Sequence, residues 1–226
     1  MTKKIDLIYD STEKCLVCHR EFPIKKVRKS RIRIVKQDED FCTYYDSTNP
    51  YFYEFLMCTH CKTVFIDSFR EYLKEGDIEI SKKLVELYSQ MQETDHLIGE
   101  RNLEDALRIS KLAILTGQIL KVPHGLMASI LMRVAWFNRY KENKVEEEKY
   151  LQYAYEEYEK AYKKGEKIIS EEMQTYLLGE LSYRLEEIEK TRMWFSRLFA
   201  LKGNIAIVNR GRDRWLTIRE REKGLL

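Results

Sequence analysis

Two short segments decide how the first third of this chain folds: residues 15–22 read CLVCHREF and residues 58–65 read CTHCKTVF. Both are Cys-x-x-Cys-x-x-x-Phe motifs. Two residues between cysteines allow a tight turn that points both sulfurs at one ion, and two such turns supply the four thiolates that Zn²⁺ accepts in a tetrahedron. We expect the phenylalanines to pack beneath the turns. The sequence therefore predicts a structural zinc site with four ligands, Cys15, Cys18, Cys58 and Cys61.

Other chemistry stays open for these motifs. The 39 residues between the two pairs exceed the roughly 15–20 of the common zinc pattern, although loop-closure entropy grows only slowly with length. Iron could replace zinc because tetrahedral sulfur suits both metals. Residues 15–19 match the c-type haem attachment motif, but the second cysteine pair would then have no purpose. A thioredoxin-like redox pair would need a βαβ setting that the sequence does not predict, and His19 or His60 could each replace a thiolate.

Composition places the chain among globular proteins. It has 226 residues, of which 34% are charged, with a net charge of +3 and five cysteines. No run of 18 apolar residues predicts a membrane helix, and the first residues lack the apolar stretch of a signal peptide. We therefore expect a cytoplasmic protein, in which disulfides are rare. We interpret Cys42 as a small buried hydrophobe rather than a reactive thiol, because nothing flanking it is basic enough to lower its pKa.

The chain divides by composition into a cysteine-containing module, residues 1–73, a helical domain, residues 74–203, and a basic tail, residues 204–226. The predicted fold class is α+β and mostly α: a small β-rich, zinc-ribbon-like module followed by an antiparallel helical repeat or bundle. Alternation of apolar and basic residues predicts a strand at 31–34, and aromatic residues predict a second strand at 51–57.

Helical periodicity dominates the rest of the sequence. Apolar spacing, caps and glycine stops predict helices at about residues 80–93, 103–117, 123–140, 151–165, 170–185 and 189–201. From residue 213 the tail could form a short basic helix. Leu178-Gly179, with Phe195 sixteen residues after the glycine, fits part of the tetratricopeptide pattern, so the repeat is degenerate.

Residues 25–36 carry seven basic side chains and no acid. This cluster could contact phosphates together with the basic tail at 210–223, which makes nucleic-acid binding an alternative function. The competing interpretation is a solvated strand whose field is cancelled by the acids at 38–40. The residues predicted to contact nucleic acid in this alternative are Lys25, Lys26, Arg28, Lys29, Arg31 and Arg33.

Aromatic residues are frequent in the helical part, and we expect most of them to form its core. Arginines and aromatics near them could instead line a groove for a peptide or protein partner. No phosphate-binding, dinucleotide-binding, zinc-protease or nucleophile-elbow motif occurs, so no enzyme is predicted. The residues predicted to bind a partner are Arg133, Trp136, Arg139, Glu180, Arg184 and Arg197.

Several stretches together resemble one bacterial family. They are the two cysteine motifs, Asp40-Phe41-Cys42, Asn49-Pro50-x-x-Tyr53, the segment 131–139, Tyr176-Leu177-Leu178-Gly179-Glu180-Leu181 and Trp194-Phe195-Ser196. Over roughly residues 12–200 the chain is similar to domain of unknown function 2225. The resemblance implies a cytoplasmic bacterial protein with a cysteine-rich module and tetratricopeptide-like helices, and no established activity. Two departures concern turns: Lys62 stands where a zinc knuckle commonly has glycine, and Leu185-Glu186 replaces a Leu-Gly turn.

The sequence thus predicts a non-enzymatic, zinc-binding interaction protein that binds a peptide or protein partner through a helical groove and has no membrane segment. Nucleic-acid binding is the first alternative. The second is a thiol sensor in which oxidation releases zinc, with Cys42 accelerating the release.

Overall fold

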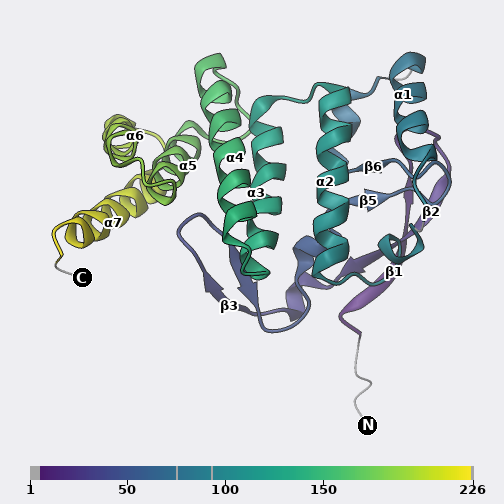
Figure 1. The fold of residues 1–226 in the computed structure, drawn as a ribbon, viewed down its shortest axis with the longest axis horizontal. Coiled ribbons are helices and arrows are strands. Elements are labelled where there is room, and N and C mark those ends of the chain that lie inside the picture. The colour runs from purple at the N-terminus through teal and green to yellow at the C-terminus, as the bar shows by residue number, and fades with distance from the viewer. Residues whose placement is uncertain (1–5, 75, 93, 225–226) are drawn as a thin grey trace, which may run out of the picture. The chain divides into compact units, whose positions relative to one another are not determined.

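The structure is a computed structural model that describes residues 6–74, 76–92 and 94–224 (Figure 1). Its strands form three separate two-stranded antiparallel sheets, β1 with β2, β3 with β4 and β5 with β6. The strands are β1 (Ile8–Lys14), β2 (Glu21–Val27), β3 (Ile34–Gln37), β4 (Thr43–Tyr45), β5 (Leu56–Met57) and β6 (Val64–Phe65).

Helices follow the strands. They are α1 (Ile78–Ser89), α2 (Leu103–Leu120), α3 (His124–Tyr140), α4 (Lys144–Lys164), α5 (Glu171–Arg184), α6 (Ile188–Ala200) and α7 (Ile205–Glu222). The predicted class is confirmed: the protein is mostly helical, with small antiparallel sheets first and a helical bundle after them. Four short 3-10 helices also occur in the described residues, η1 (Lys29–Arg31), η2 (Pro50–Tyr53), η3 (Asp67–Tyr72) and η4 (Asp95–Leu97).

The chain forms two compact units. Unit 1 contains the residues up to Gln37, Thr43–Val122 and Trp136–Asn143, whereas unit 2 contains Asp38–Cys42, Pro123–Ala135 and the residues from Lys144 onward. Helix α3 therefore contributes one end to each unit. The domain boundaries at residues 73 and 203, which rest on composition, stay a prediction.

Two predicted strands were wrong in part. Residues 51–57 form a strand only at β5, because Pro50 begins the 3-10 helix η2 and the Asn49 side chain accepts a hydrogen bond from the Tyr51 N–H at 2.9 Å. A proline at a first helical position loses no hydrogen bond, and asparagine is a favoured N-cap. The alternating segment 31–34 is likewise divided between η1 and β3.

Helix boundaries differ mainly at the chain's end. The tail forms the 18-residue helix α7, not a short helix from residue 213. Asn204 caps α7 by accepting a hydrogen bond from the Ile207 N–H at 3.3 Å. The predicted helix at 80–93 begins earlier, as α1, and its predicted end at Glu93 lies outside the described residues. Ser170 caps α5 as predicted, accepting from the Met173 N–H at 3.2 Å.

A buried chain of hydrogen bonds connects α1 and α2 to strand β6 in unit 1. The Tyr88 hydroxyl of α1 donates to the Leu112 carbonyl at 2.8 Å and lies 2.7 Å from the Thr116 hydroxyl. Thr116 in turn donates to the Val64 carbonyl of β6 at 2.6 Å. Burial raises the pKa of Tyr88 to about 12, so its proton is present at neutral pH. These bonds fix β6, the strand at the end of the second cysteine motif.

A buried guanidinium organises the next part of unit 1. Arg101 donates to three carbonyls, those of Phe52 at 3.0 Å, Phe55 at 2.6 Å and Leu97 at 2.7 Å. Burial lowers the pKa of Arg101 to about 10, which leaves it charged at neutral pH. Because carbonyls at helix and turn ends lack partners of their own, this one side chain satisfies groups from η2 and η4 at once.

Unit 2 contains a buried ion cluster. The Glu180 carboxylate of α5 is fully buried and accepts from the guanidinium of Arg214, on α7, at 2.7 and 3.2 Å. Arg184 donates to the same carboxylate at 2.8 Å and lies 3.4 Å from the carboxylate of Asp40, which is also fully buried. Two acids and two bases thus alternate inside unit 2, and each charge has a partner.

Removal of one member of this cluster should destabilise the fold. Arg214→Ala leaves the Glu180 carboxylate with only Arg184, and breaking a buried pair from one side costs about 3–5 kcal/mol. Urea unfolding followed by circular dichroism measures the loss. Arg219→Ala, an exposed residue of the same helix, is the control and should change stability by less than about 0.5 kcal/mol. Equal stability of the two variants would contradict the structural role of Arg214.

Candidate metal centre

The two cysteine motifs meet in unit 1. The sulfur atoms of four cysteines, Cys15, Cys18, Cys58 and Cys61, all lie within 4.8 Å of one another. The Cys15 and Cys61 sulfurs are 3.6 Å apart, as are those of Cys18 and Cys58. Zn–S bonds of about 2.3 Å in a tetrahedron place sulfurs roughly 3.8 Å apart. The observed spacing therefore fits one tetrahedral metal ion held by four thiolates.

Both cysteine turns are built in the same way. In each turn, the N–H two residues after the first cysteine donates to that cysteine's sulfur, from Val17 at 3.3 Å and from His60 at 3.4 Å. Each turn is closed by a backbone bond, Cys15 N–H to the Arg20 carbonyl at 3.0 Å and Cys58 N–H to the Thr63 carbonyl at 3.1 Å. Donors aimed at sulfur favour its ionised form, which is the form that binds metal.

The residue after each second cysteine has a left-handed backbone. His19 has φ 59° and Lys62 has φ 59°. Glycine adopts this region at no cost, while other residues do so at some cost in energy. The Lys62 ammonium donates to the Met91 carbonyl at 2.6 Å, so the side chain that replaces glycine gains a contact of its own. Although Lys62 is not glycine, its backbone has the same left-handed conformation as that of His19 in the first turn.

The predicted support beneath the turns is present. Phe22 and Phe65 are almost fully buried, and their rings meet edge to face with centroids 6.1 Å apart. The two turns are also joined by the His60 ring, whose Nε2 lies 3.0 Å from the Glu21 carbonyl oxygen. Aromatic packing and this hydrogen bond hold the two sulfur pairs opposite each other.

Hydrogen bonds among the thiols of the cluster shift their pKa values. Hydrogen bonding to Cys58 and Cys61 raises the pKa of Cys15. Bonding to Cys15 lowers the pKa of Cys58, but bonding to Cys61 and burial outweigh this and raise it to about 11. Hydrogen bonds from Cys15 and Cys58 hold the pKa of Cys61 well below its usual range. The neighbouring thiols therefore favour the ionised form of Cys61, and metal binding at the cluster would release protons from its thiols.

The three other candidate ligands, Cys42, His19 and His60, do not belong to this group of sulfurs in the described residues. Cys42 is fully buried and belongs to unit 2. Both His19 and His60 are exposed, and the described group of potential ligands consists of the four cysteines alone. This agrees with the interpretation of the histidines as exposed neighbours of the site.

The residues predicted to bind a partner belong to both units. Trp136 and Arg139 belong to unit 1, and the other four belong to unit 2. Trp136 is 5% exposed and Glu180 is fully buried within the ion cluster. Neither side chain offers a partner much surface, because Trp136 packs against Tyr51 and Glu180 is enclosed by two arginines. Arg197 is exposed, and its guanidinium lies 4.7 Å from the Trp194 ring centroid.

The six basic residues predicted to contact nucleic acid fall into two groups, one with side-chain contacts inside unit 1 and one exposed. Lys25 and Lys26 form ion pairs with Asp10 and Glu13 at 2.8 and 2.9 Å. The Arg28 guanidinium lies over the Tyr9 ring at 4.4 Å. The remaining three basic residues are exposed, namely Lys29, Arg31 and Arg33. Half of the predicted nucleic-acid contacts are therefore already engaged within unit 1.

Fold and site together define a class: a four-cysteine module with small antiparallel sheets, followed by a helical bundle. The chain belongs to the DUF2225 family, described as "Uncharacterized protein conserved in bacteria", whose model matches residues 8–218. A search of the curated proteins and a search of the solved structures found no match. Within the described residues no helix has the length and apolar character needed to cross a membrane.

The four-sulfur geometry predicts about one metal ion per chain, because four thiolates complete a tetrahedral site. Elemental analysis of protein purified without added metal measures this number. Cys58→Ser should lose most of the bound ion, and Cys42→Ser should keep it. The site assignment fails if the wild-type protein binds no metal and its four motif cysteines react freely with an alkylating reagent in the folded state.

Proposed function

We propose that the protein is a non-enzymatic interaction protein in which a zinc ion stabilises unit 1. The observation that supports the role of the ion is the convergence of four protein sulfurs with spacings near that of a filled tetrahedron. A tetrahedral site with four protein ligands keeps no position for a substrate, so its function is structural. Iron is the alternative occupant, because tetrahedral sulfur suits it as well.

Metal binding should contribute directly to folding. The described strands of unit 1 are at most seven residues long and pair only two at a time, and an isolated two-stranded hairpin is marginally stable. The ion connects the turn after β1 with the turn after β5, which are far apart in sequence. In small zinc domains the binding free energy is largely folding free energy.

The experiment for this proposal is removal of the metal. Chelation should lower the midpoint of thermal unfolding and abolish the slow amide exchange of β5 and β6, while the exchange of α5 and α6 in unit 2 changes little. Hydrogen exchange read by mass spectrometry measures both. Zinc added back should restore protection. Unchanged exchange in β5 and β6 after complete metal removal would refute the structural role.

The second part of the proposal is that the helical part binds a peptide or protein partner. It is supported by Arg197 of α6, an exposed arginine whose guanidinium lies over two aromatic rings, those of Trp194 and Tyr162. Arginines and aromatic residues are enriched where protein interfaces are strongest. Of the six residues predicted from the sequence, Arg197 is the exposed one and thus the best placed to meet a partner directly.

Arg197→Ala should weaken capture of the partner from the native host's lysate by about tenfold or more, the effect of an interface hot spot of roughly 1.4 kcal/mol. Quantitative affinity purification compares the variant with wild type. Arg192→Ala is the matched control, because Arg192 lies on the same helix, is exposed and pairs only with Glu189 in the described contacts. A partner captured equally by both variants would place the interface elsewhere.

Nucleic-acid binding is the second candidate, favoured by the three exposed basic residues that lack an ion pair among the described contacts, Lys29, Arg31 and Arg33. Binding through them should weaken with salt, with a log–log slope of roughly −3 for duplex DNA. Replacing all three with serine should remove it, whereas replacing the paired Lys25 and Lys26 should not. Absence of binding to duplex DNA and single-stranded RNA at low salt would eliminate this candidate.

A further inference from the structure

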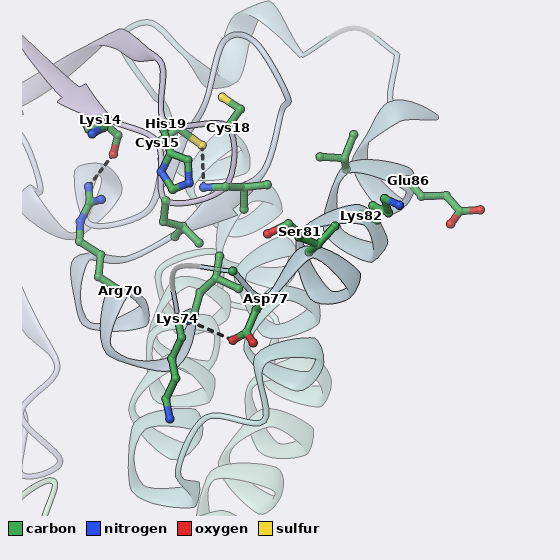
Figure 2. A pocket seen from close by; sticks show the side chains of 16 residues that line it. Lys14, Cys15, Cys18, His19, Arg70, Lys74, Asp77, Ser81, Lys82 and Glu86 are labelled. Carbon is green, nitrogen blue, oxygen red and sulfur yellow. Dashed lines mark hydrogen bonds between the residues drawn. The ribbon is translucent and has the colours of Figure 1, made fainter.

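A hollow of about 800 Å³ opens beside the first cysteine turn of unit 1. Figure 2 shows its three walls: the turn that contains Cys15, Cys18 and His19, the segment from Arg70 to Lys74, and one face of α1. This volume falls in the range of about 300–1,000 Å³ that is typical of binding sites. No role for it follows from the metal site, because the sulfurs need no further ligand.

Helix α1 has more apolar surface than the core of unit 1 uses. Leu84 and Tyr88 are fully buried and form its inner face. Ile78 and Val85 instead line the hollow and are 65% and 39% exposed. They are seven residues apart, hence on one side of the helix and separated by about 10.5 Å. Ser81 and Lys82, which also line the hollow, lie between them, and exposed apolar surface rimmed by polar residues marks binding sites.

The opposite wall is apolar and held by the metal site. Leu16 and Val17 lie between the two ligands of the first turn and line the hollow, each with 7% of its surface exposed. The hydrogen bond from the Val17 N–H to the Cys15 sulfur fixes this turn. A bound ion would hold both cysteines, so the hollow should keep its shape only when the metal is present.

The charges around the hollow favour an acidic ligand. Four lining residues are basic and two are acidic. Arg70 is engaged with Asp67 and with the Lys14 carbonyl. Within the described part of the chain, no ion pair involves the ammonium groups of the three lining lysines, Lys14, Lys74 and Lys82. Carboxylates brought next to these lysines would gain charge-assisted contacts.

The exposure of the rim indicates a polypeptide rather than a small molecule. A compact ligand inside the hollow would leave the outer surfaces of Ile78 and Val85 in water. A chain segment that carries two apolar side chains about two helical turns apart could cover both, as amphipathic helices do in apolar grooves.

We infer that this hollow is the docking site for an acidic, amphipathic segment of a protein partner, whose apolar side chains insert between Ile78 and Val85 of α1 and Leu16 and Val17 of the first cysteine turn. The inference rests on the proposed function and adds to it the site and the chemistry of the partner. It places this contact in unit 1, whereas Arg197 belongs to unit 2.

A defined peptide tests the inference with the metal-loaded full chain. The probe is a fluorescein-labelled synthetic helix with leucines at positions i, i+3 and i+7, glutamates flanking them and alanines at the remaining positions. Anisotropy should report binding, and amide resonances of Ile78 and Val85 should shift. Ile78→Asp and Val85→Asp should each weaken the affinity about tenfold, the scale of one lost apolar contact with added like charge. Leu87→Asp, also on α1 and 37% exposed but outside the hollow, is the matched control and should bind as wild type does.

Two further peptides test the chemistry. Lysine in place of each glutamate, or serine in place of each leucine, should weaken binding about tenfold or more. The inference is overturned if the Leu/Glu peptide fails to bind wild type at millimolar concentration, if it binds Ile78→Asp and Val85→Asp as well as it binds Leu87→Asp, or if the lysine peptide binds equally well. Loss of binding after metal removal is expected. Undiminished binding by metal-free protein would instead contradict the structural role of the metal and leave the docking site standing.

Discussion

Unit 1 depends on the approach of four sulfurs from two distant turns. Its sheets have two strands each, and none of them could stand alone in water. The turns that hold the sulfurs lie between β1 and β2 and between β5 and β6, so an ion at the sulfurs would connect these four strands at one point. Helix α2 then completes the arrangement through Thr116, which hydrogen-bonds to β6.

Unit 2 is held together by aromatic packing and a buried ion cluster. Its helices surround aromatic side chains, among them the buried Tyr176, Trp194 and Phe195, and a chain of alternating charges runs from Asp40 to Arg214. Buried ion pairs are costly to desolvate, so they contribute little net stability compared with apolar packing. Their effect is geometric, because a carboxylate that must meet two guanidinium groups permits one arrangement of α5 and α7. Apolar packing alone would permit several.

Much of this could be predicted from the sequence, and the reasons are physical. The cysteine motifs fix their own local geometry, because two residues between ligands leave few turns that aim both sulfurs at one point. The helices follow from apolar spacing and from caps such as Ser170. The strand predicted at 51–57 was largely wrong because a proline at a helix start outweighed the β preference of the aromatic residues around it. The partner at Asp40 could not be predicted, since its pairing with α5 joins residues more than a hundred positions apart.

Some of the candidate sites could also be predicted from the sequence, and others could not. The convergence of the four motif cysteines was predictable, because two residues between the members of each pair aim both sulfurs at one point. The surface residues were not, because the same arginine pattern serves a core ion cluster at Arg184 and an exposed face at Arg197. The hollow beside α1 has a sequence signal that periodicity can detect, namely Ile78 and Val85 seven residues apart on a different side of the helix from the buried Leu84. Its other wall, at Leu16 and Val17, becomes visible only when the cysteine turn is placed next to α1.

Each of the two units is assembled from segments that are separated in sequence. The chain passes between them five times, because residues 38–42 and one end of α3 belong to a different unit from their neighbours in sequence. Neither unit is therefore a continuous stretch of polypeptide. Cutting the gene at any single codon would deprive one fragment of the Asp40 segment or divide a helix. Modular exchange with other proteins would have to transfer both units together, and deletion mapping would confuse loss of folding with loss of an interface.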